Sequence, residues 1–325
     1  MWFWLSLIAI LFWSGSDLFS KMGSEPDDKY SHWKMVIAVG LIMGLHAAVM
    51  LILASFDNIS SVVGETMANE LPIGFSVSHI ITYLPASACY IISMILGYIG
   101  LRYLVLSVST PICNSSGAVA CLLFFFIMKE SLSPWQIIAI ALIVCSVVGL
   151  AVFERNQEVN TLRAKGELQK KYTHGWIAIG LPVLYCIIDA LGTFIDGFLL
   201  IQTDDAGNII SGVIEEAPAN IAYELTFFLM AIISAVYVYV IKRQKISKKA
   251  DIPKLTAGIC ETAGQLAYIY ALGDNAVVAA PLISSYCVFS LLWARIILRE
   301  KLKIKQYAII ALAVAGIIIL GITDA

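Results

Sequence analysis

The hydrophobic residues of this chain form ten long runs that are separated by shorter polar segments. A helix needs about 20 mostly apolar residues to cross the hydrocarbon layer of a bilayer, and each run is close to that length. We therefore predict ten membrane-spanning helices. Their expected bounds are Trp2–Lys21, Trp33–Leu53, Ile80–Gly100, Val105–Met128, Trp135–Phe153, Gly175–Ile201, Ala219–Ile241, Ile252–Leu272, Asn275–Leu298 and Gln306–Ile322.

The composition agrees with this pattern. Of the 325 residues, 60% are hydrophobic and only 14% are charged, which is far more apolar than a soluble domain. The chain is expected to be an all-α integral membrane protein. Its seven cysteines form no CxxC pair and all fall inside predicted helices, so we interpret them as small buried hydrophobes and expect no metal site and no cofactor.

A long internal repeat divides the chain. Thirty-two residues beginning at Pro111 align without a gap on those beginning at Pro281, at a constant offset of 170 that pairs Ser115 with Ser285. Duplicated hydropathic halves are typical of secondary transporters. We expect a first five-helix repeat over residues 1–153, a cytoplasmic linker over 154–174 and a second five-helix repeat over 175–325. Because five is odd, the second half inserts upside down relative to the first.

Basic residues are distributed unevenly over the predicted loops. When bases at the ends of helices are counted with the adjacent loop, the odd-numbered loops hold 20 of the 21 lysines and arginines, and the even-numbered loops hold only Lys129. By the positive-inside rule, the odd loops are cytoplasmic and both chain ends face outside. The inverted arrangement agrees, since the loop Phe56–Val77 has no base whereas its counterpart Lys242–Lys254 has six.

The turn before the last helix of each half reads "MKESLS" and "LREKLK". With ten spans and an inverted duplication, this chain resembles the EamA-type transporters of the drug/metabolite transporter superfamily over nearly its whole length. The resemblance implies carriage of a small solute such as an amino acid, a sugar or a quaternary ammonium compound. Many relatives have both termini in the cytoplasm, so the orientation predicted here differs from that pattern.

Carboxylates inside the apolar runs are the main candidates for chemistry, because each costs about 2.5 to 3.5 kcal/mol at mid-span. Asp17, Asp189 and Glu261 lie deep, while Asp196 and Glu224 lie nearer the outer surface and can simply be solvated or paired. His46 is expected to be a hydrogen-bonded packing residue. The deep acids therefore form the expected substrate-binding or coupling site.

Helical spacing adds polar and aromatic neighbours to these acids. Trp13 precedes Asp17 by one turn, as Tyr185 precedes Asp189, so each half contributes an aromatic ring beside a carboxylate. Core packing is the alternative for the rings, and a proline kink between close-packed small residues is the alternative for the hydroxyls near Pro111 and Pro281. The further candidates are Gln265 and Tyr268 beside Glu261, and Asn114, Ser115, Ser285 and Tyr286 near the two prolines.

Two uses of these acids remain open. A buried carboxylate can take up and release a coupling proton, whereas an ionised carboxylate beside aromatic faces attracts an organic cation. We predict a secondary active transporter of a small polar or cationic metabolite that works by alternating access in the plasma membrane, as a monomer or homodimer. A neutral solute such as a sugar or amino acid is the alternative substrate. Nucleic acid is not an expected partner.

Proteins of other classes fit the sequence less well. An intramembrane aspartyl protease also carries paired aspartates, but Ala271 stands where the first glycine of its GxGD signature belongs, and Tyr185 is not adjacent to Asp189. We therefore expect no enzymatic activity. A membrane receptor or scaffold that does not transport would need no deep polar cavity, and uptake by proteoliposomes would separate it from a transporter.

Overall fold

The computed structural model describes residues 1–325 except 24–27, 57–70, 104–114, 129–131, 165–175, 204–208, 246–247, 298, 300–301 and 324–325. Its longer helices are α1 (Trp2–Gly23), α2 (Ser31–Ala54), α5 (Val77–Tyr103), α8 (Pro134–Ala164), α10 (Trp176–Leu200), α11 (Glu216–Ala235), α12 (Lys248–Ile283) and α14 (Ile304–Thr323). The shorter elements are α7 (Ser116–Leu123), α13 (Tyr286–Ile296), the π-helical turns η1 (Phe124–Met128) and η2 (Val236–Ile241), and the strands β1 (Ile201–Thr203) and β2 (Ile209–Ser211).

The expected all-α membrane class is confirmed. Seven helices of the described part are long and apolar enough to cross a membrane, and two shorter apolar helices cover Ser116–Ile127 and Pro134–Leu150. Among the described elements, only the strands β1 and β2 are not helices. They are antiparallel, lie in the loop after α10 and pair Ile201 with Ser211. The total of ten spans stays a prediction, since residues 104–114 of the expected fourth helix lie outside the described residues.

One boundary differs clearly from the predicted one. α8 continues to Ala164, eleven residues into the expected linker 154–174, because nothing in its polar continuation stops a helix before that point. The expected boundary between the eighth and ninth helices is present inside α12 as a bend at Asn275, whose φ of −161° and ψ of 85° are extended rather than helical. The side chain of Asn275 accepts a hydrogen bond from the Val278 backbone N–H at 3.4 Å and so starts the second arm.

The predicted ninth helix, Asn275–Leu298, is interrupted shortly after Pro281. α12 ends at Ile283, and α13 begins at Tyr286 after a turn at Ser284 and Ser285. Because proline has no N–H, it cannot make the helical hydrogen bond to the preceding turn. The Ser284 hydroxyl donates to the Pro281 carbonyl at 2.7 Å, and the chain bends at this turn. At the repeat offset of 170, α7 begins at Ser116, the counterpart of Tyr286.

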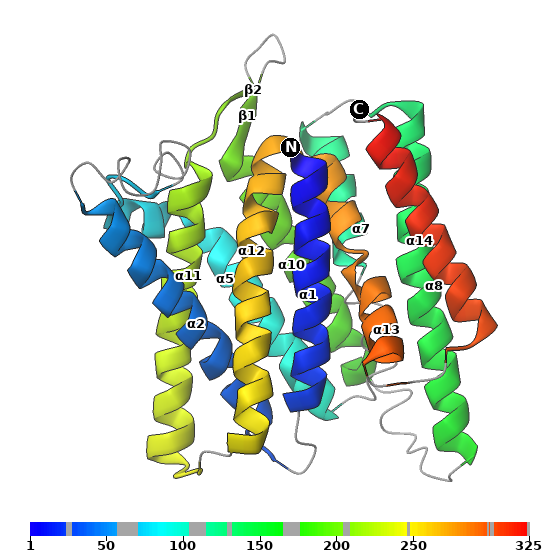
Figure 1. Ribbon diagram of the computed structural model, residues 1–325, viewed down its shortest axis with the longest axis horizontal. Coiled ribbons are helices and arrows are strands. Elements are labelled where there is room, and N and C mark those ends of the chain that lie inside the picture. Colours follow the sequence, from blue (N-terminus) through cyan, green and yellow to red (C-terminus); the bar gives the residue numbers. More distant parts are fainter. Residues whose placement is uncertain are drawn as a thin grey trace.

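Helices at equivalent places in the two halves have equivalent neighbours. α1 packs against α12 and α13, and its counterpart α10 packs against α5 and α7. The second helices of the halves, α2 and α11, pack against each other, as do the fifth helices, α8 and α14 (Figure 1). Each half thus contacts the other through its first helix. That residues 1–153 superpose on residues 175–325 remains a prediction.

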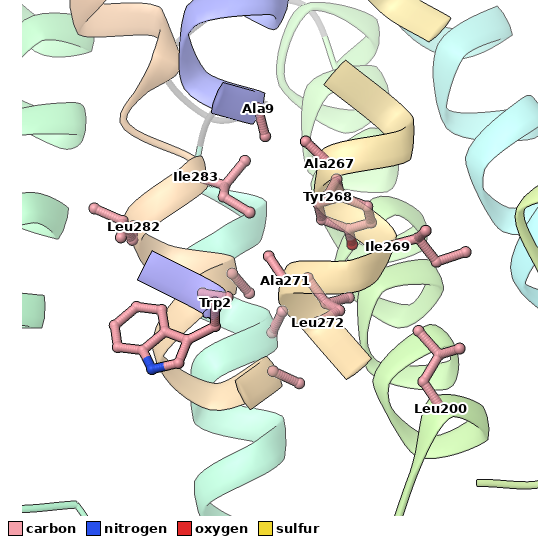
Figure 2. Packing of buried hydrophobic residues seen from close by; sticks show 14 of the residues in the cluster. Trp2, Ala9, Leu200, Ala267, Tyr268, Ile269, Ala271, Leu272, Leu282 and Ile283 are labelled. Atoms are coloured by element: carbon pink, nitrogen blue, oxygen red, sulfur yellow. The ribbon is translucent and has the colours of Figure 1, made fainter. Parts of the chain in front are cut away.

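The core lies where α1 meets both arms of α12. Figure 2 shows Ala9 of α1 with Ile283 on one side and Ala267 and Tyr268 on the other. Small side chains let these helices approach closely, which is how helices associate when lipid surrounds them. Many large apolar side chains face outward instead, among them Leu45, Ile52, Leu229, Ile233 and Val240. A bilayer would cover them.

Glycines set the contact between α2 and α11. A Cβ atom at Gly40 would lie 2.5 Å from the Cβ of Ala231, and one at Gly44 would lie 2.5 Å from Cγ of Phe228. These glycines are four residues apart and face α11 together, so only a hydrogen atom fits at either place.

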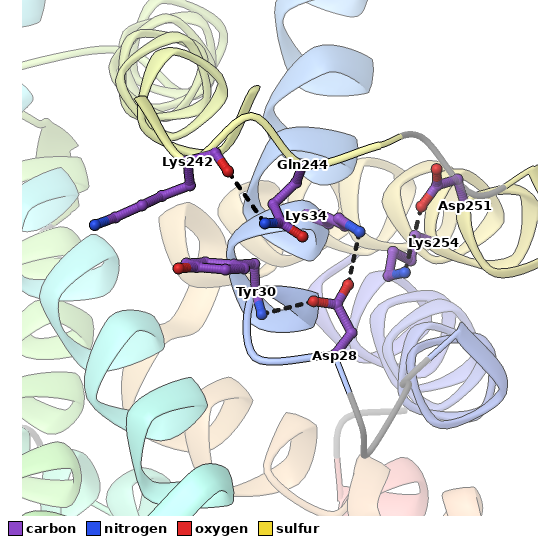
Figure 3. Close-up of polar contacts among 7 residues, drawn as sticks. All are labelled: Asp28, Tyr30, Lys34, Lys242, Gln244, Asp251 and Lys254. Atoms are coloured by element: carbon purple, nitrogen blue, oxygen red, sulfur yellow. Dashed lines mark hydrogen bonds and ion pairs between the residues drawn. The ribbon is translucent and has the colours of Figure 1, made fainter. Parts of the chain in front are cut away.

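The two ends of the bundle carry different features. Both chain termini and the β1–β2 pair lie at one end, and the beginnings of α2 and α12 lie at the other (Figure 1). Four charges meet at this second end (Figure 3): Lys34 Nζ lies 2.6 Å from Asp28 Oδ2, and Lys254 Nζ lies 3.4 Å from Asp251 Oδ1. Burial acts to raise the pKa of Asp28, but the hydrogen bonds from Lys34 and from the Tyr30 N–H outweigh it and hold that pKa below its usual range.

Candidate functional site

Two predicted acids from different halves meet at the contact between α1 and α12. Asp17 of α1 lies within electrostatic range of Glu261 of α12, and these two helices pack against each other. The Ser290 hydroxyl of α13 donates to Asp17 Oδ2 at 2.8 Å, and Ser16 hydrogen bonds with Glu261. Neighbouring carboxylates repel when both are ionised, so this pair favours any state that holds one positive charge or one proton between them.

Three aromatic rings adjoin this acid pair. The ring of Trp13 is 4.9 Å from that of Tyr268 at an interplanar angle of 37°, and 5.8 Å from that of Tyr286 at 70°. Tyr286 also lies within electrostatic range of Asp17, Asp189 and Glu261, so it connects the acids of the two halves. Rings beside carboxylates provide two kinds of attraction for a positive charge.

Asp189 of α10 lies on the opposite side of this group. Its Oδ1 accepts a hydrogen bond from the Ser93 hydroxyl of α5 at 2.9 Å, and Ser116 at the start of α7 also hydrogen bonds with it. Because α10 packs against α5 and α7, the carboxylate is satisfied by its immediate neighbours. Tyr268 and Tyr286 both lie within electrostatic range of it.

A second carboxylate on α10 has the densest set of partners. Tyr83 donates to Asp196 Oδ1 at 2.6 Å, and Tyr90 donates to Asp196 Oδ2 at 3.2 Å. The hydroxyls of Tyr90 and Tyr268 are 2.6 Å apart, so the network continues to the aromatic rings beside Trp13. We call Asp196, Tyr83, Tyr90 and Tyr268 the tyrosine network. Sequence reasoning misses Asp196 and Tyr83 as site residues, since helical spacing carries no information on contacts between α5 and α10.

Exposure changes steadily along the site. Asp17 is exposed and Glu261 is half-buried, whereas Gln265 and Tyr268 are each only 4% exposed. Asp196 and Tyr83 have no exposed surface. Asp17 lies toward the end where α2 and α12 begin, and Asp196 lies toward the end with the termini, because α1 and α10 run in opposite directions through the bundle (Figure 1). The acid pair therefore lies toward the basic end and keeps exposed surface, whereas Asp196 and Tyr83 of the tyrosine network are buried toward the other end.

Three buried polar atoms of the predicted site are unsatisfied. Trp13 Nε1, Gln265 Nε2 and Ser285 Oγ have no hydrogen-bond partner among the described residues. Most buried polar groups in proteins have a partner, and leaving one without costs about 1 to 3 kcal/mol. The described part of the chain has two further such atoms, Ser87 Oγ and Asn220 Oδ1, outside the predicted site.

The remaining predicted residues lie elsewhere or are not described. Tyr185 is half-buried on α10 one turn before Asp189, and Ser115 is half-buried just before α7. Asn114 lies outside the described residues. The structure therefore brings together Asp17, Glu261, Gln265, Trp13, Tyr268 and Tyr286, with Asp189 and Ser285 at the edge of this group.

His46 and Glu224 form a separate pair between α2 and α11. His46 Nδ1 lies 2.8 Å from Glu224 Oε2, and the Asn220 side chain donates to Glu224 Oε1 at 3.0 Å. His46 is hydrogen bonded as predicted, and its role in packing stays a prediction. Among the described residues, no cluster of three His, Cys, Asp or Glu side chains could hold a metal ion.

Comparisons with known proteins agree with this architecture. The sequence profile of the EamA-like transporter family matches residues 209–322, the greater part of the second expected half. The resemblance to EamA-type drug/metabolite transporters is thereby confirmed for this segment, and the chain is similar to membrane transporters of that type. No curated protein matches the chain.

The fold is shared with solved structures. One, titled only "Crystal structure of protein", has a TM-score of 0.67 and 12% sequence identity, and the match covers 99% of this chain and 96% of that one. At this identity the likeness concerns the fold alone.

Proposed function

Given the EamA-like segment over residues 209–322, we propose that this chain is a secondary active transporter that moves a small polar or cationic metabolite across the plasma membrane by alternating access. The observation that supports it most directly is the acid pair Asp17 and Glu261 beside the rings of Trp13 and Tyr286. A packed apolar core would have no use for two adjacent carboxylates.

The acid pair suggests how transport is coupled. With both carboxylates ionised the pair is doubly negative, and either a proton or a cationic solute relieves the repulsion. Proton and cation thus compete for the same groups. A proton arriving from one side displaces the solute, and the solute displaces a proton from the other side, so a pH gradient drives exchange.

The tyrosine network supplies the closed end that alternating access needs. In this conformation Asp17 is exposed, and Asp196 is fully buried and hydrogen bonded to Tyr83 and Tyr90. Tyr83 and Tyr90 belong to α5 of the first half and Asp196 belongs to α10 of the second. Rocking of one half against the other would part these hydrogen bonds and open the opposite end.

A neutral solute such as a sugar or amino acid is the second candidate substrate. The observation that favours it is the set of unsatisfied donors, Trp13 Nε1, Gln265 Nε2 and Ser285 Oγ, since hydroxyl and carbonyl oxygens would satisfy them.

Transport by the purified protein in proteoliposomes tests the proposal. Vesicles loaded with a mixture of labelled organic cations, amino acids and sugars are placed across a pH gradient, and efflux is measured for the wild-type chain and for Glu261→Gln. We expect at least one solute to move with the wild type and about tenfold less with the variant. Glu215→Gln, which alters an exposed carboxylate just before α11, is the matched control and should transport normally. Equal rates for wild-type and empty vesicles with every solute would refute the proposal.

A further inference from the structure

Two of the unsatisfied donors lie on the same two helices as the acid pair, one helical turn away from it. On α1, Trp13 lies one turn before Asp17, and on α12, Gln265 lies one turn after Glu261. α1 starts at the end of the bundle with the termini, whereas this arm of α12 runs toward that end (Figure 1). Both donors therefore lie on the same side of the acids, displaced by about 5 Å, the rise of one helical turn.

The contact between the helices brings the two donors together. A Cβ atom at Gly264 would lie 2.7 Å from Trp13 Nε1, so the indole N–H rests against the backbone of the residue that precedes Gln265. Because Gly264 has no side chain, the indole ring reaches the surface of α12 there.

Ser285 lies at the same level. Gln265 precedes Asn275, the bend between the two arms of α12, by ten residues, and Ser285 follows it by ten. At about 1.5 Å per residue, Gln265 and Ile283, the last residue of α12, are about 15 Å and about 12 Å from that bend, and Ser285 lies in the turn that follows. Ser285 also precedes Tyr286, whose ring contacts Trp13.

The chemical character of these atoms is informative. Trp13 Nε1 and Gln265 Nε2 can only donate hydrogen bonds, and the Ser285 hydroxyl can donate one. The two N–H groups repel a cation and bind an oxygen with lone pairs, and the serine hydroxyl can donate to the same oxygen. The carboxylates one turn away have the opposite preference. One small molecule that satisfies both levels must carry a positive charge at one end and an oxygen acceptor at the other.

We propose that the substrate is an organic cation that carries a hydroxyl, carbonyl or carboxylate oxygen within a few bonds of its ammonium group. The inference rests on the proposed function and narrows it. The ammonium group lies between Asp17 and Glu261 beside the rings of Trp13 and Tyr286, and the oxygen accepts from Trp13, Gln265 and Ser285. An ammonium ion without the oxygen leaves these donors unsatisfied and is therefore discriminated against.

Three matched probes separate the two requirements. Choline has both the ammonium and the oxygen, tetramethylammonium lacks the oxygen, and dimethylbutanol replaces the ammonium nitrogen of choline by carbon. Binding to purified protein in nanodiscs is measured from thermal stabilisation across a concentration series. We expect choline to bind at least about tenfold more tightly than either other probe, since one good hydrogen bond to a buried donor corresponds to a factor of this order.

Two variants connect this preference to the named atoms. Gln265→Leu, which keeps the volume and removes the donor, should reduce the preference of choline over tetramethylammonium at least about threefold while tetramethylammonium binds as before. Its ligand-free form should melt at a higher temperature than the wild type, because an unsatisfied buried donor is gone. Gln306→Leu is the control, since the buried Gln306 side chain already accepts a hydrogen bond from the Lys303 N–H at 2.9 Å. That variant should leave the preference unchanged.

The outcomes distinguish the inference from the function on which it rests. Equal affinity for choline and tetramethylammonium, or a preference for choline that Gln265→Leu leaves intact, would overturn the inference although gradient-driven transport could still be observed. Failure of all three probes to bind also overturns it. Loss of choline and tetramethylammonium binding together in Glu261→Gln supports the assignment of the ammonium group to the acid pair.

Discussion

Asp189 and Glu261 are both half-buried, and each accepts a hydrogen bond from a serine, so their amides are good structural substitutes. We expect Asp189→Asn and Glu261→Gln to fold normally and to reduce gradient-driven transport at least about tenfold, because an amide cannot carry the charge that changes during exchange. Transport across a pH gradient and counterflow without one are the two measurements.

The counterflow result assigns the role. A residue that only carries the proton, once neutralised, still permits exchange of solute for solute, whereas a residue that binds the cation loses counterflow as well. Wild-type rates in both variants would mean that these carboxylates are structural.

Asp28 predicts a pH dependence of stability at the basic end. Its folded pKa lies below the unfolded value of about 3.9, so the contact with Lys34 stabilises the fold above that pH, and the stabilisation is lost as pH falls through the folded pKa. After allowance for solvent screening, Asp28→Asn should therefore lower stability by about 1 kcal/mol near neutral pH and have little effect in strong acid, as measured by thermal unfolding. A difference that persists in acid would show that shape, not charge, makes the contact.

At the scale of helices, two glycines should respond in opposite ways to the same change. Gly44→Ala places a Cβ atom 2.5 Å from Cγ of Phe228, so α2 and α11 must separate, at a cost of about 1 to 3 kcal/mol. Gly180→Ala on α10 meets nothing within 4 Å and should stabilise by up to about 1 kcal/mol through helix propensity. Urea or thermal unfolding in detergent measures both. If Gly44→Ala were neutral, the close contact of the two helices would not hold in solution.

Much of each helix could be predicted from the sequence, because about 20 apolar residues in a row have few other places to lie. The predicted start at Trp2 and the predicted boundary between Leu272 and Asn275 agree with the structure. The break between Ile283 and Tyr286 is harder to predict, because it falls inside an apolar run and leaves no polar loop in the sequence. The depth of Asp17 and Glu261 in the apolar runs predicts each of them as a candidate site residue. That the two lie near each other depends on how α1 packs against α12, which helical spacing does not encode.

For the molecule as a whole, the arrangement of its ends leads to a prediction of orientation. The loops that hold 20 of the 21 basic residues should face the cytoplasm, and the termini and the β1–β2 pair, at the opposite end in Figure 1, should face outside. A variant without native cysteines, given one cysteine at Val213 or at Gln244, reports the sides through a membrane-impermeant maleimide applied to intact cells, because Val213 and Gln244 lie at opposite ends of the segment formed by α11 and η2. We expect labelling at Val213→Cys only. Labelling at Gln244→Cys only would reverse the orientation. The acid pair would then lie toward the outer side of the membrane, and the conformation described here would be the outward-facing one.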